Sequence, residues 1–104
     1  MSGGGTATGR LERALTAHAA RCGLALSIDD NRATRWASAT FVGARHRLEM
    51  TLGGEISAGQ DWIAGLPEAD LPLPGHLVAD LIVIGRRTGD AGLTATIEVL
   101  TVED

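Results

Sequence analysis

The sequence predicts an α+β fold in which an N-terminal helix packs on one face of a curved five-stranded antiparallel sheet. Three observations favour this class: one amphipathic helical stripe, several segments of alternating apolar and polar residues, and turn-forming residues between them. The predicted order is helix, three strands, short helix or loop, two strands. We expect residues 1–9 to form a flexible Gly-rich tail and residues 10–104 to form a single domain.

The first predicted element is a helix over residues 10–22. Its apolar side chains recur at helical spacing from Leu11 to Cys22 and form one stripe. Thr8 is a candidate N-cap, and Gly23 suits the left-handed position that often ends a helix. The stripe predicts which side of this helix faces the sheet.

Three strands are predicted after this helix, at residues 24–28, 34–42 and 45–52. A polar turn at residues 29–32 separates the first from the second. Gly43 and Ala44 are predicted to close a hairpin between the second and third strands as a type II′ turn. This register places Phe41 opposite His46 and gives the hairpin one apolar and one mostly polar face.

Residues 53–75 are predicted to interrupt the sheet, with a short helix that starts near Ser57 and a proline-rich loop after it. Two longer strands follow, at residues 76–85 and 92–102, around a turn at residues 87–91. Both faces of this second hairpin carry aliphatic side chains, although a sheet covered on one side only would need just one apolar face.

The composition excludes several kinds of chemistry. All nine basic residues are Arg, so the chain has no lysine for a Schiff base, for pyridoxal phosphate or for the usual phosphate-binding loop. The absence of Tyr excludes a phenolic general acid. A single Cys allows no disulfide within the chain and no four-cysteine zinc site.

Net charge and hydropathy predict the cellular compartment and exclude two classes of partner. The net charge of −4 argues against a nucleic-acid partner, which normally requires a basic surface. The longest apolar run, residues 81–84, is too short to cross a membrane. The N-terminal segment lacks the pattern of a secretory signal, so we expect a cytoplasmic protein without a membrane partner.

The candidate catalytic residues are Asp80, Glu98 and His76. The predicted register sets the two carboxylates side by side, where like charges raise one pKa and create an acid–base pair. Arg45, Arg47 and Trp36 are candidate ligand-binding residues, since the same face is predicted to carry them. The plainer alternatives are that the arginines neutralise the carboxylates, or that the carboxylates border an interface.

The predicted interface residues are aliphatic side chains on the second face of the last hairpin: Val78, Ile82, Ile84 and Leu100. Many of the apolar residues are Ala, which buries little area, so the core is predicted to be thin. A thin core and an apolar second face both favour burial against a second copy of the chain.

No metal and no cofactor are predicted. His18, His46 and His76 are few and scattered, and none of them has the short spacing of paired metal ligands. His18 is interpreted as a core histidine bonded to a backbone carbonyl, and His46 similarly as a core histidine. A metal held by these two with Glu12 or Asp29 is the alternative.

Two functions follow from these observations. The favoured one is a small binding or assembly module that homodimerises through the sheet, with any further protein or small-molecule partner left open. The alternative is a small acid–base enzyme or ligand-binding cup that uses the carboxylate pair. The path of residues 53–75 distinguishes them, because a loop over the sheet would wall a pocket and a loop at an edge would leave the interface free.

Overall fold

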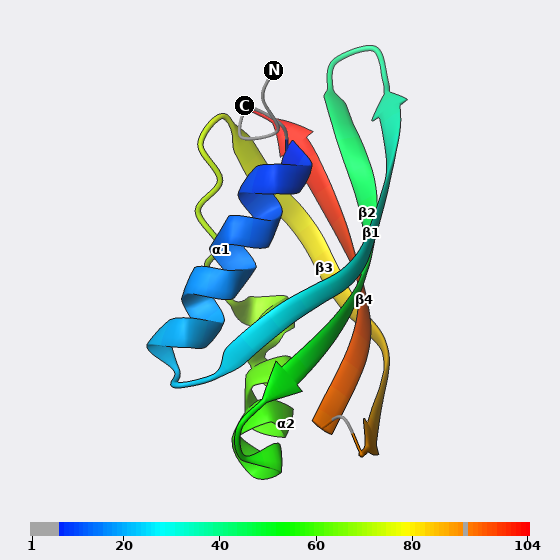
Figure 1. The fold of residues 1–104 in the computed structure, drawn as a ribbon. Helices are drawn as coiled ribbons and strands as arrows, with labels where there is room; N and C mark the ends of the chain where they lie inside the picture. The colour runs from blue at the N-terminus through cyan, green and yellow to red at the C-terminus, as the bar shows by residue number, and fades with distance from the viewer. Residues whose placement is uncertain (1–6, 91) are drawn as a thin grey trace.

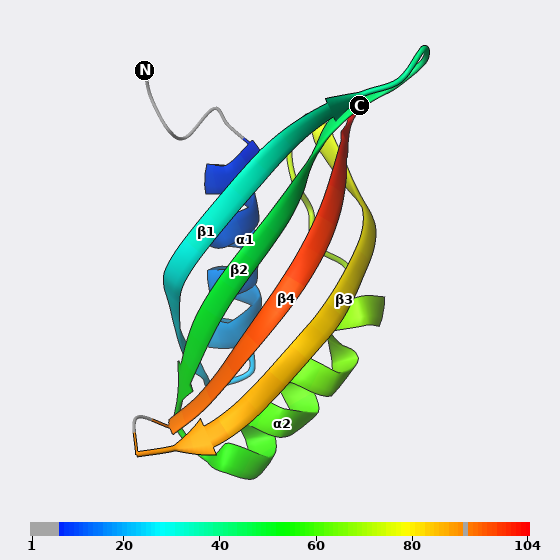
Figure 2. The same cartoon turned by 90° about the vertical axis from the view of Figure 1, so that its right-hand side faces the viewer.

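The computed structural model describes residues 7–90 and 92–104, which form two helices on one face of a four-stranded antiparallel sheet (Figure 1). The elements in chain order are α1 (Ala7–Arg21), β1 (Ala25–Ala37), β2 (Val42–Gly53), α2 (Ile56–Gly65), the short 3-10 helix η2 (Leu66–Glu68), β3 (His76–Gly89) and β4 (Gly92–Glu103). The strand order in the sheet is β1-β2-β4-β3. Figure 2 shows the sheet in front and both helices behind it.

The core lies between the helices and the sheet. The apolar stripe of α1 buries Leu11, Leu15 and Ala19, which confirms the predicted first helix. The strands in the middle of the sheet, β2 and β4, bury every second side chain along most of their length. These alternating side chains meet the helices on one side only, as expected for a half-buried antiparallel sheet.

The prediction of five strands is wrong, because the predicted first and second strands belong to one strand, β1. The polar residues 29–32 continue this strand and do not turn. A register shift between Ile28 and Asp30 accommodates one extra residue, so that Ile28 lies opposite Met50 and Asn31 lies opposite Leu48. The alternation of apolar and polar residues is interrupted here, which favoured a turn. In the structure, one extra residue in the strand restores the alternation.

Asn31 also shows why this polar run is compatible with a strand. Its side-chain amide donates a hydrogen bond to the carboxylate of Glu12 on α1 at 2.8 Å. On the same run, the hydroxyl of Thr51 donates to the Asp29 carboxylate at 2.5 Å. Polar side chains that find such partners can stay within a strand.

The predicted turn at Gly43 and Ala44 is also wrong. The chain reverses over residues 38–41, where the backbone N–H of Ser38 donates to the carbonyl of Phe41 at 2.7 Å. Gly43 and Ala44 lie inside β2 and are buried. His46 therefore pairs with Ala33 and not with Phe41.

The second hairpin is longer than predicted, and its register differs. Residues 87–89 belong to β3, and the predicted turn extends to residue 91, which lies outside the described residues. Extra residues in β3 shift its register between Val78 and Asp80 and again between Val83 and Gly85. Consequently, Asp80 does not pair with Glu98 as predicted.

Residues 53–75 cover the inner face of the sheet, because α2 and η2 bury Trp62, Ile63 and Leu66 in the core. The indole N–H of Trp62 donates to Nδ1 of His18 at 2.8 Å and ties α2 to α1. His18 thus accepts a hydrogen bond from an indole, and within the described part of the chain it forms none to the backbone carbonyl predicted as its partner. Residues 53–75 therefore neither wall a pocket over the sheet nor lie along its edge, which were the two predicted paths. They complete the layer that covers the core.

The N-terminal segment differs from the prediction. The predicted tail, residues 1–9, falls mostly outside the described residues, and residues 7–9 belong to α1. Within the described part of the chain, no helix is long and apolar enough to cross a membrane.

Gly43 occupies a position where two elements approach too closely for a side chain. A Cβ atom built there would meet the carbonyl oxygen of Thr101 and lie 2.8 Å from Cζ2 of Trp36. By contrast, a Cβ atom at Gly85 would meet no heavy atom within 4 Å. The sequence feature read as a turn is therefore a packing requirement.

We expect the Gly43→Ala variant to lower the free energy of unfolding by about 1–3 kcal/mol, because the added methyl group forces strand β4 or the Trp36 ring to move. Urea unfolding followed by tryptophan fluorescence measures this change. The matched variant Gly85→Ala should change the stability by less than about 0.5 kcal/mol. Equal stabilities of the two variants would contradict the close approach at Gly43.

Candidate functional site

The first candidate site is the outer face, which we define as the sheet face opposite α1 and α2. Among the described residues, no helix packs on this face (Figure 2). Its most exposed large apolar side chains come from β3, with Leu77 57% exposed, Ile82 46% exposed and Ile84 45% exposed. Leu100 and Val102 of the neighbouring strand β4 are only partly buried. The outer face therefore presents an apolar strip along β3 and β4.

Charged side chains border this strip. Nη1 of Arg47 lies 3.2 Å from a carboxylate oxygen of Glu98, which forms an ion pair between β2 and β4. Arg45 and Asp80 line a small hollow of about 90 Å³ together with Ile82, Glu98 and Leu100. Within the described ranges, neither Arg45 nor Asp80 forms an ion pair.

The structure brings together most of the predicted outer-face residues. Arg45, Arg47, Asp80 and Glu98 share this face, but Asp80 lies opposite Leu100 and Glu98 lies opposite Ile82. The two carboxylates therefore do not form the predicted cross-strand pair. Glu98 has Arg47 as its partner, so among the described residues the neutralisation alternative holds for Glu98 but not for Asp80.

Two predicted residues lie on the other face. Val78 pairs with the buried Thr101 and packs against the core, so it is not on the outer face. His76 lines a cavity on the inner side of the sheet and is separated from Asp80. Both differences arise from the extra residue in β3 between Val78 and Asp80, which changes the face that the preceding residues occupy.

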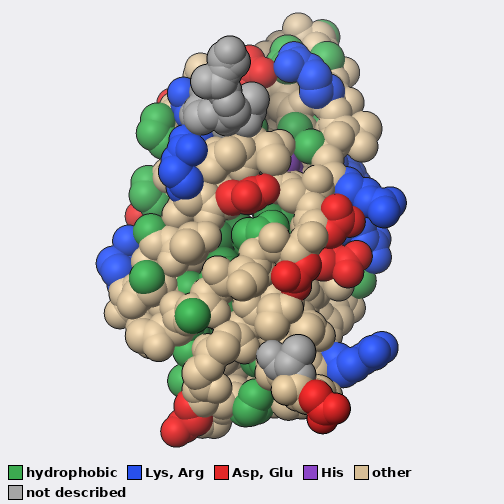
Figure 3. Space-filling view, in the orientation of Figure 1, with side chains coloured by type: hydrophobic (Ala, Val, Ile, Leu, Met, Phe, Trp, Pro, Cys, Tyr) green, Lys and Arg blue, Asp and Glu red, His purple; other side chains and the backbone are tan. Residues whose placement is uncertain are grey.

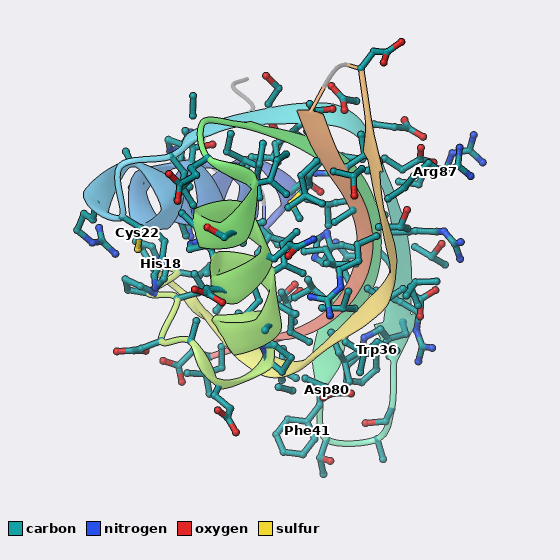
Figure 4. All side chains as sticks on the ribbon, turned by 90° about the horizontal axis from the view of Figure 1, so that it is seen from below. His18, Cys22, Trp36, Phe41, Asp80 and Arg87 are labelled. Atoms are coloured by element: carbon teal, nitrogen blue, oxygen red, sulfur yellow. The ribbon has the colours of Figure 1, made fainter. Side chains whose placement is uncertain are left out.

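Trp36 and the labelled side chains of Figure 4 show how the two sides of the molecule differ. Trp36 and Arg87 lie on the sheet side, whereas His18 and Cys22 lie on the helix side. Trp36 pairs with Gly43, and its ring covers that glycine. Its indole N–H is buried and has no hydrogen-bond partner among the described residues. Trp36 thus packs against the backbone and does not form a free aromatic wall.

The second candidate site, which we call the histidine cavity, has a volume of about 360 Å³ and lies between the start of α1 and the sheet. Figure 3 shows that histidine contributes very little to the face of the molecule in this view. The polar side chains that line the cavity come from α1 and all four strands: Thr8, Arg35, His46, His76, Thr101 and Glu103. Its other lining residues are alanines and Gly43, whose small size leaves the space open.

Exposure falls from the mouth of the cavity to its closed end. The side chains of Arg35 and Glu103 are 79% and 48% exposed and lie 3.8 Å apart at the mouth. His46 and Thr101 are fully buried and form the closed end. The opposite charges at the mouth leave the entrance close to neutral.

His46 is held by one of its two ring nitrogens. Nε2 lies 2.9 Å from the hydroxyl oxygen of Thr101, and that hydroxyl lies 3.3 Å from the carbonyl oxygen of Ala44. Nδ1 is buried and has no partner among the described residues. Burial lowers the pKa of His46, and the charge of His76 lowers this pKa further.

His76 is held in a similar way at the other side of the cavity. Its Nδ1 lies 3.3 Å from the carbonyl oxygen of Pro74, and a carbonyl can only accept, so Nδ1 is the donor. Across the described ranges, no group of three His, Cys, Asp or Glu side chains is placed to hold a metal ion. The cavity therefore offers imidazole and hydroxyl groups as its chemistry.

His46 is buried, as predicted for a core residue, but the cavity that it lines was not predicted. The cavity depends on the ends of four strands and the start of α1 meeting at one place, which no local pattern encodes. The small side chains beside His46, Ala33 opposite it on β1 and Ala44 two residues before it on β2, are the signal that could have indicated the cavity.

We expect the stability of the protein to fall as the pH drops below the ordinary histidine pKa of about 6.5. The folded state holds His46 with a lowered pKa, so the unfolded chain binds the proton more readily. Stability is therefore complete above pH 6.5 and is lost as the pH falls toward the pKa of the folded state. One group contributes at most about 1.4 kcal/mol per pH unit.

Urea unfolding between pH 5 and 7.5 measures this slope, and the variant His46→Gln is the comparison. Glutamine retains a donor for Thr101 but does not titrate. The variant should show a flatter pH dependence in this window than the original chain. Parallel curves for the two proteins would contradict the role of His46.

Comparison with protein-family models, with curated proteins and with solved structures found no match to this chain. The two candidate sites lie on opposite sides of the sheet. Any functional assignment therefore rests on the residues and geometry of these two sites.

Proposed function

We propose that this chain is a binding and assembly module that forms a homodimer, in which the outer face of one copy packs against the outer face of a second copy. The observation that carries the proposal is the uncovered apolar strip, with Leu77, Ile82 and Ile84 each at least 45% exposed. Several large apolar side chains exposed on one face of a small domain indicate an interaction site.

The layered construction of the fold supports a second copy as the occupant. A sheet normally buries an apolar face against another layer, and here the helices supply that layer on the inner face only. The molecule measures 44 × 24 × 23 Å, so a face spanning the two longer dimensions offers up to about 1,000 Å² per copy. A standard interface needs only about 800 Å² from each partner.

The outer face carries charges of both signs, including Arg45 and Asp80. In a twofold dimer the same surface meets itself, so Arg45 of one copy can face Asp80 of the other. Arg45 and Asp80 line the same hollow without an ion pair of their own among the described residues. A second copy supplies each of them with an opposite charge.

The edge strand β3 favours packing through the face and not through the edge. An exposed edge pairs with another strand most readily when it is long and regular. β3 carries two register shifts within its 14 residues. Such irregularities interrupt a continuous hydrogen-bonding edge.

We expect the Ile82→Ser variant to weaken self-association at least tenfold, because the substitution removes an exposed apolar side chain from the strip. Sedimentation equilibrium from low to high micromolar concentration measures the dissociation constant. Phe41→Ser is the matched control, since Phe41 is 56% exposed but lies in the β1–β2 connection. That control should dimerise as the original chain does.

Two results would overturn the homodimer that packs through the outer face. The original chain could sediment as a monomer at high micromolar concentration, or Phe41→Ser could weaken association as much as Ile82→Ser. The second result would locate the contact at the hairpin tip.

A charge exchange tests the twofold arrangement separately. Arg45→Glu and Asp80→Arg should each weaken the dimer by a factor of about two to five, the range for partly exposed ion pairs. The double variant should recover most of the loss, because the cross-copy pair is restored with its charges reversed. Additive losses in the double variant would show that these two residues do not meet across the interface.

A further inference from the structure

We propose that the histidine cavity is a binding site for a small neutral molecule that carries a hydroxyl group and donates its hydrogen to Nδ1 of His46. This site is on the inner side of the sheet and is independent of the proposed homodimer. Its volume of about 360 Å³ falls within the range of small-ligand pockets.

The hydrogen bonds of Thr101 determine which nitrogen of His46 carries the proton. The carbonyl oxygen of Ala44 can only accept, so the Thr101 hydroxyl donates its single hydrogen to it. The Thr101 oxygen then accepts from Nε2–H of His46. This is the one assignment that makes both contacts hydrogen bonds. In the neutral ring, Nδ1 is therefore left as an acceptor.

This acceptor is buried and has no donor among the described residues. A buried polar atom without a partner destabilises a protein, so native structures supply one. His76 does not supply it, because the hydrogen bond that the structure gives His76 joins its Nδ1 to the carbonyl oxygen of Pro74 and none joins it to His46. His46 lines the cavity, so a molecule bound there can supply the missing donor.

The walls indicate the rest of the ligand. The charges of Arg35 and Glu103 compensate each other at the mouth, so neither an anion nor a cation is favoured. The small side chains of Ala33 and Ala44 leave room for an apolar body beside the imidazole. A neutral alcohol or phenol combines an apolar body with one hydroxyl donor.

The test uses phenol as the probe and toluene as its counterpart without a donor. In the full-length ¹⁵N-labelled protein, long-range nitrogen–proton spectra report Nδ1 and Nε2 of His46 separately. Phenol should shift the Nδ1 resonance of His46 and saturate this shift. The preference for phenol over toluene should fall about tenfold in His46→Phe, which removes the acceptor and keeps a ring.

A second pair of variants keeps the test independent of that buried substitution. Ala33→Leu fills the cavity beside His46 from an exposed position and should abolish phenol binding. Ala37→Leu places the same side chain on the same strand outside the cavity lining and should bind phenol as the original chain does.

Three outcomes would overturn the proposal. Phenol at tens of millimolar could leave Nδ1 of His46 unshifted, which would show that water alone occupies the cavity. Toluene could bind as well as phenol, which would remove the role of the donor. Ala33→Leu could bind phenol unchanged, which would place the phenol site elsewhere.

Discussion

Both helices lie on the same face of the sheet, and most other properties of this molecule depend on that one-sided packing. Leu11 of α1 and Ile63 of α2 are buried in the same core as the inner side chains of β2 and β4, so these central strands bury one side-chain row each. The hydrogen bond from Trp62 to His18 keeps the two helices in the same layer. Because both helices pack on the inner face, no described helix covers the outer face. The apolar strip along β3 is the direct consequence.

The sequence predicted the class of the fold and the first helix, but the strand count was wrong for identifiable reasons. The stripe from Leu11 to Ala19 is local and strongly periodic, so α1 was predictable. The polar run at residues 29–32 broke the alternation by one residue, and one-residue insertions cannot be told from turns without the neighbouring strand. Gly43 was misread for a similar reason, since its requirement comes from Trp36 and Thr101, which are distant in sequence.

The candidate sites were predictable to different degrees. Arg45, Arg47, Asp80 and Glu98 were placed on one face correctly, because the register shifts of β3 lie outside the stretch from Asp80 to Val83 and β2 and β4 pair without a shift. His76 and Val78 were placed on the wrong face, because the extra residue before Asp80 reverses the alternation. The histidine cavity could not be predicted at all, since residues from α1 and four strands enclose it. Local patterns therefore predict the members of a strand face, and the register between strands decides which faces meet.

The pairing of β2 with β4 links the two sites. Gly43 lies opposite Val102 and Ala44 lies opposite Thr101. The Trp36 ring covers Gly43, while the Thr101 side chain holds the imidazole of His46 on the inner side. A shift of β4 at this point would move Thr101 away from His46 and would also disturb the close contact of its carbonyl with Gly43. The pairing of Gly43 and Ala44 with β4 therefore constrains both the tautomer of His46 and the packing of Trp36. It does so although the apolar strip and the cavity lie on opposite faces of the sheet.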